Sequence, residues 1–205
     1  VDIQPVLYAG RESAEKRRDA VAALVRNGAS SLILSAPDSI NWLLNIRGGE
    51  TPNTPAALGF AALRVDGSVD LFMDPRKFTA ATRAHLGDEV TIHRPDDLGA
   101  FLDRLGGAGE TVLVASETTP SWIVERLREA GAELLSGEDP CTLPKACKNS
   151  IELQGMRQAH IRDGAALCRF FAWLAAEAPK VTVDEMGAVE ALYAFRASGD
   201  LFRGL

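Results

Sequence analysis

The sequence of 205 residues predicts an α/β fold, in which a mixed β-sheet is flanked by helices and is followed by a separate pair of helices. Short apolar runs alternate with helical patterns between residues 31 and 137, which is typical of a sheet covered by helices. Asp66-Gly67 separates two of these runs, and this dipeptide is a strong hairpin signal. The hairpin makes the predicted sheet mixed rather than purely parallel.

The first half of the chain begins with a helix that has recognisable ends. Ser13 is a suitable cap, Glu15 lies in the first turn, and Asn27-Gly28 is a typical stop. The elements predicted after this helix are a strand over 31–35, a short helix from Pro37 through Leu44, and two hairpin strands over 59–65 and 68–74.

The second half continues the alternation of helices and strands. Asp96-Asp97 indicates a helix start. The predicted elements are a helix near 76–86, a strand near 89–93, a helix near 97–105, a glycine-rich loop over 106–110, a strand over 111–116, a helix over 120–131 and a strand over 132–137.

The pattern changes near residue 140. Asn149 with Glu152 resembles a capping box for a long helix that stops before Pro179, and Thr182 with Glu185 predicts a second helix to about Ala197. The apolar faces carry Met156, Leu167, Phe170, Phe171, Leu174, Val189, Leu192 and Phe195. Because such faces normally pack on a sheet, we expect the chain to be cut inside a domain, with one domain over 1–143 and the start of another over 144–205.

Composition and charge exclude several classes of function. The net charge of −6 and pI of about 5.1 argue against a nucleic-acid partner or an anionic membrane. No apolar run is long enough for a membrane span, and residues 1–6 do not form a signal peptide. Cys141, Cys147 and Cys168 have no metal-binding spacing, and each is expected to pack rather than react. These features favour a reduced, cytoplasmic protein.

The residues alone predict no catalytic or metal-binding site. His85, His93 and His160 lack a metal-binding spacing, and surface or structural roles are expected for them. Neither a nucleophile elbow nor a dinucleotide-binding glycine motif occurs. Taken alone, these residues indicate a soluble α/β domain followed by the beginning of something else.

Two segments resemble a known family. The pattern Tyr-x-Gly-x-x-Ser-x-x-Lys, followed by Trp-Leu-x-Asn-x-Arg-Gly-Ser-Asp-x-Pro-x-x-Pro, is similar to the middle domain of three-domain Xaa-Pro aminopeptidases, in the creatinase/prolidase family. The matching residues are Tyr8, Gly10, Ser13, Lys16, Trp42, Leu43, Asn45, Arg47, Gly48, Pro52 and Pro55. The chain departs from the pattern at Gly49 and Glu50, so a hydroxyl is lost and the acid is kept in kind.

The C-terminal part resembles the first helix of the same family's pita-bread catalytic domain. The matching residues are Lys148, Asn149, Glu152, Arg157, Ala159, His160, Arg162, Asp163 and Gly164. The resemblance therefore implies a creatinase N-terminal-like α/β domain followed by a two-helix stub of a pita-bread α+β domain.

The resemblance implies an activity for a longer parent protein. The parent would be a metal-dependent aminopeptidase that removes the residue before proline, acting on peptides with proline at the second position. It would be a cytoplasmic homodimer with two divalent metals, expected to be manganese, held by carboxylates and a histidine beyond Leu205. No metal ligand or catalytic residue is carried onto this chain, so it is expected to be inactive alone.

The segment between Arg47 and Pro55 is predicted to be a stiff loop. Its prolines fix φ and restrict the residues before them, and its glycines permit a sharp turn. By resemblance, the loop would lie near the substrate, with Arg47, Gly48, Glu50, Pro52 and Pro55 as its residues. The alternative is a surface connection whose prolines serve stability.

Three other functions remain open. The first is a non-catalytic protein-interaction module of the pita-bread family, whose exposed helical face would bind a protein partner. A prolidase or creatinase would share the fold. A small-molecule site at a sheet crevice ranks last, because no phosphate-binding loop occurs.

Overall fold

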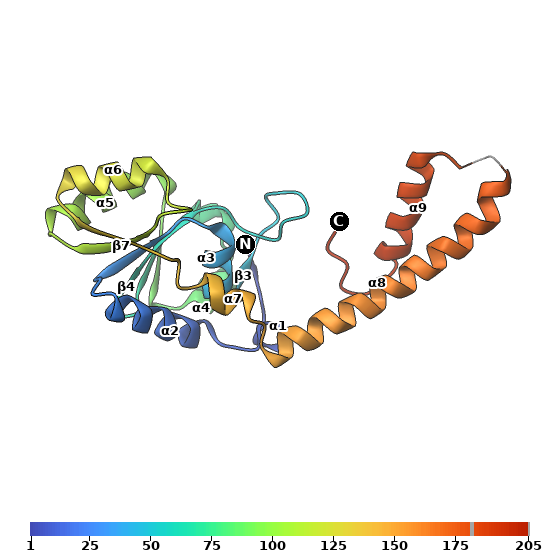
Figure 1. The fold of residues 1–205 in the computed structure, drawn as a ribbon, viewed down its shortest axis with the longest axis horizontal. Coiled ribbons are helices and arrows are strands. Elements are labelled where there is room, and N and C mark those ends of the chain that lie inside the picture. Colours follow the sequence, from blue (N-terminus) through green and yellow to red (C-terminus); the bar gives the residue numbers. More distant parts are fainter. Residues whose placement is uncertain (181–182, 205) are drawn as a thin grey trace. The chain divides into compact units, whose positions relative to one another are not determined.

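The computed structural model describes residues 1–180 and 183–204, and these form two compact units (Figure 1). The first unit spans Val1–Lys148 and contains the sheet. The second spans Asn149–Leu205, and in its described part the regular elements are helices. Within the described residues, no helix has the length and apolar character needed to cross a membrane.

The first unit is built on a six-stranded sheet with the order β6-β5-β4-β2-β7-β8. The strands are β2 (Ser31–Leu34), β4 (Phe60–Arg64), β5 (Val69–Phe72), β6 (Val90–His93), β7 (Thr111–Ala115) and β8 (Glu133–Gly137). Strand β4 is antiparallel to both β2 and β5, and the other neighbours are parallel. The predicted mixed sheet is therefore confirmed.

Helices cover both faces of this sheet (Figure 1). One apolar core lies between the sheet and α2 (Ser13–Arg26), α3 (Pro37–Leu44) and α4 (Ala80–Leu86). The other lies under α5 (Leu98–Gly107) and α6 (Ser121–Ala130). Residues from opposite sides of the pleat supply the two cores, as the alternation of side chains in a strand requires.

Short elements complete this unit. The sequence pattern did not predict β1 (Asp2–Ile3), α1 (Val6–Ala9), β3 (Ile46–Arg47), η2 (Pro95–Asp97) or α7 (Thr142–Ala146), whereas η1 (Pro75–Lys77) overlaps the helix predicted near 76–86. Strands β1 and β3 pair antiparallel, with Asp2 opposite Arg47. Elements of two to five residues are too short to show a hydrophobic period.

Three local predictions need correction. Ser13 is the first helical residue of α2 rather than its cap, and Glu12 holds the cap position without a side-chain bond. The helix predicted near 76–86 is two helices, because the Thr79 side chain accepts a bond from the Thr82 N–H and starts α4 anew. Gly106-Gly107 form the end of α5 rather than part of a loop.

The second unit consists of α8 (Ser150–Glu177), η3 (Ala178–Lys180) and α9 (Glu185–Ala197). The predicted capping box is confirmed, since Asn149 accepts from the Glu152 N–H at 3.0 Å while Glu152 accepts from the Asn149 N–H at 2.9 Å. Asp163 and Arg196 join α8 to α9 through two hydrogen bonds of 2.6 and 3.2 Å.

The predicted start of the second helix of this unit differs from the observed one. Thr182 lies outside the described residues, whereas Asp184 caps α9 by accepting from the Gly187 N–H at 2.7 Å. The end of α9 at Ala197 agrees with the prediction. Large apolar side chains remain exposed on both helices, including those of Met156, Phe171, Met186 and Val189.

Candidate functional site

The predicted loop projects from the first unit between β3 and β4 (the cyan loop in Figure 1). We call residues 48–59 the proline loop. Its tip, Thr51–Pro55, is exposed. The tip is a tight turn, in which the Thr54 N–H donates to the Thr51 carbonyl at 3.2 Å and Asn53 has a φ of 62°. Asparagine is among the few residues that adopt this left-handed conformation readily.

The base of the proline loop is fixed by backbone contacts. The Asn41 side chain makes two hydrogen bonds of 2.9 Å with Ala57, donating to its carbonyl and accepting from its N–H. Gly48 lies so close to Ala57 that a Cβ at Gly48 would come within 2.5 Å of the Ala57 Cα and N atoms. Glycine is therefore needed for this approach of two chain segments.

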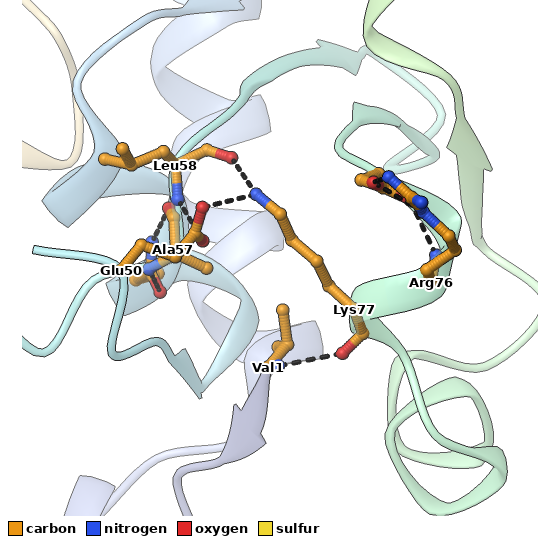
Figure 2. Close-up of polar contacts among 8 residues, drawn as sticks. Val1, Glu50, Ala57, Leu58, Arg76 and Lys77 are labelled. Carbon is orange, nitrogen blue, oxygen red and sulfur yellow. Dashed lines mark hydrogen bonds and ion pairs between the residues drawn. The ribbon is translucent and has the colours of Figure 1, made fainter.

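A second set of contacts closes the loop around Glu50 (Figure 2). One carboxylate oxygen accepts from the Leu58 N–H at 2.9 Å, and the other pairs with the Lys77 ammonium at 2.5 Å. The same ammonium donates to the Leu58 carbonyl at 3.3 Å. We call Glu50, Leu58 and Lys77 the loop clamp. Both oxygens of Glu50 are thus engaged within the protein.

The electrostatics of the loop clamp favour an ionised Glu50. Partial burial opposes the charge, but the hydrogen bonds from Lys77 and from the Leu58 N–H outweigh it, and the pKa of the Glu50 carboxyl is lowered from 4.5. The side chains of Glu50 and Lys77 remain 31% and 28% exposed. Water therefore screens the pair, and its contribution to stability is modest.

Glu50→Gln is expected to lower the free energy of unfolding by about 0.5–1 kcal/mol at neutral pH, because it removes one partially exposed ion pair. A lowered folded-state pKa means that the stabilisation is present above the unfolded-state value of 4.5 and is lost as the pH falls through the folded-state pKa. Urea unfolding of the wild type and variant across this range should show their difference shrinking in acid. Glu117→Gln, at an exposed carboxylate, is the control. A difference that persists unchanged in acid would contradict the assignment.

Arg47 ends β3, immediately before the proline loop, and is half-buried. In the antiparallel pairing of β1 with β3, Arg47 is the backbone partner of Asp2. Its guanidinium donates a hydrogen bond to the Ile46 carbonyl at 2.8 Å. The prolines predicted for the loop, Pro52 and Pro55, lie at the exposed tip. The five predicted residues therefore lie in different places. Arg47 is in β3, Gly48 is at the packed base, Glu50 is in the loop clamp, and Pro52 and Pro55 are at the tip.

A buried polar cluster supports the segment that leads into the loop. Lys16 is 2% exposed and donates to the Asn45 side-chain oxygen at 2.6 Å and to the Trp42 carbonyl at 3.0 Å. Its ammonium also lies 4.4 Å from the centre of the Trp42 ring. Asn45 in turn donates to the Arg11 carbonyl at 2.8 Å. Residues from the two N-terminal family patterns therefore meet in one network.

The histidines have structural contacts, as predicted. His85 is 3.0 Å from the Leu44 carbonyl, and His93 is 2.7 Å from an Asp70 oxygen and stacks on Phe72. His160 is 2.8 Å from the Met156 carbonyl on the surface of α8. In the parts of the chain that the structure describes, no three His, Cys, Asp or Glu side chains gather in a way that could hold a metal. These residues do not fit the two-metal centre that the resemblance implies for the parent.

The cysteines follow the prediction in part. Cys141 packs in the core between the sheet and α2, α3 and α4, and burial raises the pKa of its thiol. Cys147 and Cys168 are exposed, so the expectation that they pack was wrong. A surface depression of about 570 Å³ lies elsewhere, over α5 and α6, where the Asp103–Arg126 pair faces Trp122.

The fold and the site define a mixed-sheet α/β domain with a loop that is clamped near both ends. The chain belongs to the creatinase/prolidase N-terminal domain family, whose pattern matches residues 1–152. It is 34% identical over 215 aligned positions to a protein of Aspergillus niger named "Probable Xaa-Pro aminopeptidase P", covering all of this chain and 34% of that protein. The chain thus spans about a third of the length of such relatives.

Solved structures agree with this assignment. A crystal structure of X-prolyl aminopeptidase from Caenorhabditis elegans, described as a cytosolic enzyme with a di-nuclear active site, matches 99% of this chain and 34% of that one, with a TM-score of 0.91 and 25% identity. An Xaa-Pro dipeptidase from Bacillus anthracis matches 91% of this chain and 49% of that one, with a TM-score of 0.66 and 17% identity, and so shares the fold.

Proposed function

We propose that this chain is part of a metal-dependent Xaa-Pro aminopeptidase, which removes the N-terminal residue that precedes proline. The observation that carries the proposal is the similarity of the whole chain to proteins named for this activity, together with the fold of an X-prolyl aminopeptidase. The substrates would be peptides with proline at the second position. The enzyme would act in the cytoplasm, as a homodimer with two divalent metals, and we propose manganese.

The proposal divides the work between this chain and the rest of the enzyme. Residues 144–205 would begin the catalytic domain, and the metal ligands would come from outside these 205 residues. Residues 1–143 would support the substrate through the proline loop. Arg47 is the group proposed to face the peptide, whereas Glu50 would shape the loop, because both of its oxygens already have donors.

The test compares this chain with the full-length enzyme on an Xaa-Pro peptide. The full-length enzyme should release the N-terminal residue with manganese and stop when a chelator removes the metal, whereas the 205-residue chain should release none. A peptide with alanine at the second position is the control for specificity. Release by the short chain, or no release by the full-length enzyme, would overturn the proposal.

The same assay tests whether the proline loop contributes to substrate binding, through a variant of Arg47. Arg47→Ala should lower kcat/KM about tenfold, because a hydrogen bond from a charged donor contributes about 1.5 kcal/mol or more. Arg76→Ala is the matched control, since Arg76 pairs with Asp74 on the surface. An unchanged kcat/KM in Arg47→Ala would make the loop a structural connection and leave the activity proposal intact.

A further inference from the structure

Lys77 links three segments that are far apart in the sequence. Its ammonium contacts Glu50 and the Leu58 carbonyl, and its own carbonyl accepts from the Val1 nitrogen at 2.8 Å (Figure 2). Lys77 is the last residue of η1, the short helix that follows β5. The side chain of Lys77 thus holds the proline loop, while its backbone carbonyl holds the edge of the unit where β1 begins.

The loop clamp closes the proline loop near both of its ends. Glu50 comes shortly after β3, and Leu58 comes shortly before β4. Leu58 donates its N–H to Glu50 and offers its carbonyl to Lys77, so both of its backbone polar groups are held in the same clamp. The exposed tip lies between these two points. Holding both ends limits the conformations open to the tip.

The neighbouring residue Arg76 has a different role. Its guanidinium makes hydrogen bonds of 2.6–3.0 Å with Asp74, and its side chain is 89% exposed (Figure 2). The two adjacent cations thus differ sharply: Arg76 binds within its own turn, and Lys77 reaches across to another loop. This contrast supplies a matched control at the next position.

We infer that Lys77 is a positioning residue that holds the proline loop in its substrate-binding conformation through Glu50 and Leu58. The inference rests on the proposed function, because it deepens the role assigned to this loop. Lys77 acts through the loop and does not touch substrate. An ion pair with two additional backbone contacts restrains a loop that would otherwise lose entropy each time a peptide binds.

The first measurement follows the loop itself, by hydrogen exchange on the 205-residue chain. Lys77→Met keeps most of the length of the unbranched side chain and removes the charge. The Leu58 amide and the hydrogen-bonded amides of Thr54, Ala56 and Ala57 should exchange about 3- to 10-fold faster, since local opening becomes easier. Lys77→Arg should keep most of the protection, and Arg76→Met should leave it unchanged. Amides of β2 should be unaffected in all three variants.

The second measurement follows catalysis in the full-length enzyme on an Xaa-Pro peptide. Lys77→Met should raise KM by about 3- to 10-fold with little change in kcat, because ordering the loop then costs part of the binding free energy. Lys77→Arg should restore KM. A purely structural lysine would lower the amount of folded enzyme and so the total rate, without moving KM.

The outcomes separate this inference from the proposed function. Faster exchange together with a raised KM supports the inference. Unchanged loop exchange in Lys77→Met overturns it, whatever the activity. Faster loop exchange in Lys77→Met with an unchanged KM also overturns the positioning role. If Arg47→Ala then leaves kcat/KM unchanged as well, the loop has no part in substrate binding. If the full-length enzyme has no Xaa-Pro activity, the proposed function fails while the exchange result still tests the clamp.

Discussion

Lys16→Ala is expected to lower the free energy of unfolding of the first unit by about 3 kcal/mol. Lys16 is buried, and its ammonium serves the Asn45 side chain and the Trp42 carbonyl. Removing the ammonium takes a hydrogen bond from each of two buried acceptors, which costs about 1–3 kcal/mol. Removing the side chain also leaves a cavity under the Trp42 ring. A loss of this size increases the unfolding equilibrium constant by about two orders of magnitude.

Urea unfolding, followed by tryptophan fluorescence and far-ultraviolet circular dichroism, measures this loss. Arg18→Ala is the control, because Arg18 is an exposed cation on the same helix. Lys16→Met separates the two contributions: it fills most of the space but cannot donate, so it should recover the packing part alone. A Lys16→Ala variant as stable as Arg18→Ala would show that the buried cluster contributes nothing.

Gly48→Ala is expected to destabilise the first unit by about 2–3 kcal/mol. The added methyl group would lie 2.5 Å from backbone atoms of Ala57, and Ala57 is held by two hydrogen bonds to Asn41. Because the obstacle is backbone rather than a flexible side chain, the loop must move to accommodate the change. Overpacking of this kind costs about 1–3 kcal/mol.

Gly49→Ala provides a strict comparison, since a methyl group there meets no atom within 4 Å. It should change the unfolding midpoint little, whereas Gly48→Ala should lower it clearly in the same urea titration. In the full-length enzyme, Gly48→Ala should also impair peptide hydrolysis more than Gly49→Ala does. Equal midpoints for the two variants would rule out the close approach of Gly48 and Ala57.

Most of the sheet and its helices could be predicted because their signals are local. Pro37 starts α3 and the apolar run ends at Leu44, so its bounds agree with the prediction. The Asp66-Gly67 turn joins β4 and β5, where Gly67 has a φ of 86°, a conformation that glycine adopts without strain. In these cases short stretches of sequence specify both the element and its end.

The contacts that fix the loop could not be predicted in the same way. The Asn41 side chain reaches Ala57 across 16 residues, and Lys77 reaches Glu50 across 27. No periodicity relates such pairs, because the fold alone brings them together. The pairing of β1 with β3 has the same origin. The signals that were available, a polar residue in the apolar helix 37–44 and a lysine after the hairpin, are common and do not identify a partner.

The residues of the candidate site could be identified only by their resemblance to the family pattern. The structure shows which of them are exposed and which hold the loop. The pattern around Arg47 and the two prolines identified the loop, and Glu50 stood out as a departure from it. Which of these residues point outward and which hold the loop depends on tertiary contacts. Residue types alone do not separate a carboxylate that faces a ligand from one that binds a lysine of its own protein.

The strand order has a consequence for how the protein is made. Strand β2 lies in the centre of the sheet, where Ser31 pairs with Arg64 on one side and with Val112 on the other. A ribosome adding about 5–20 residues per second needs on the order of 4–16 s to synthesise the roughly 80 residues between β2 and β7. During that interval the nascent chain can complete β2, β4 and β5 but leaves one edge of β2 unpaired. During this period the unpaired edge of β2 is open to other chains, whereas β7 covers it in the finished sheet.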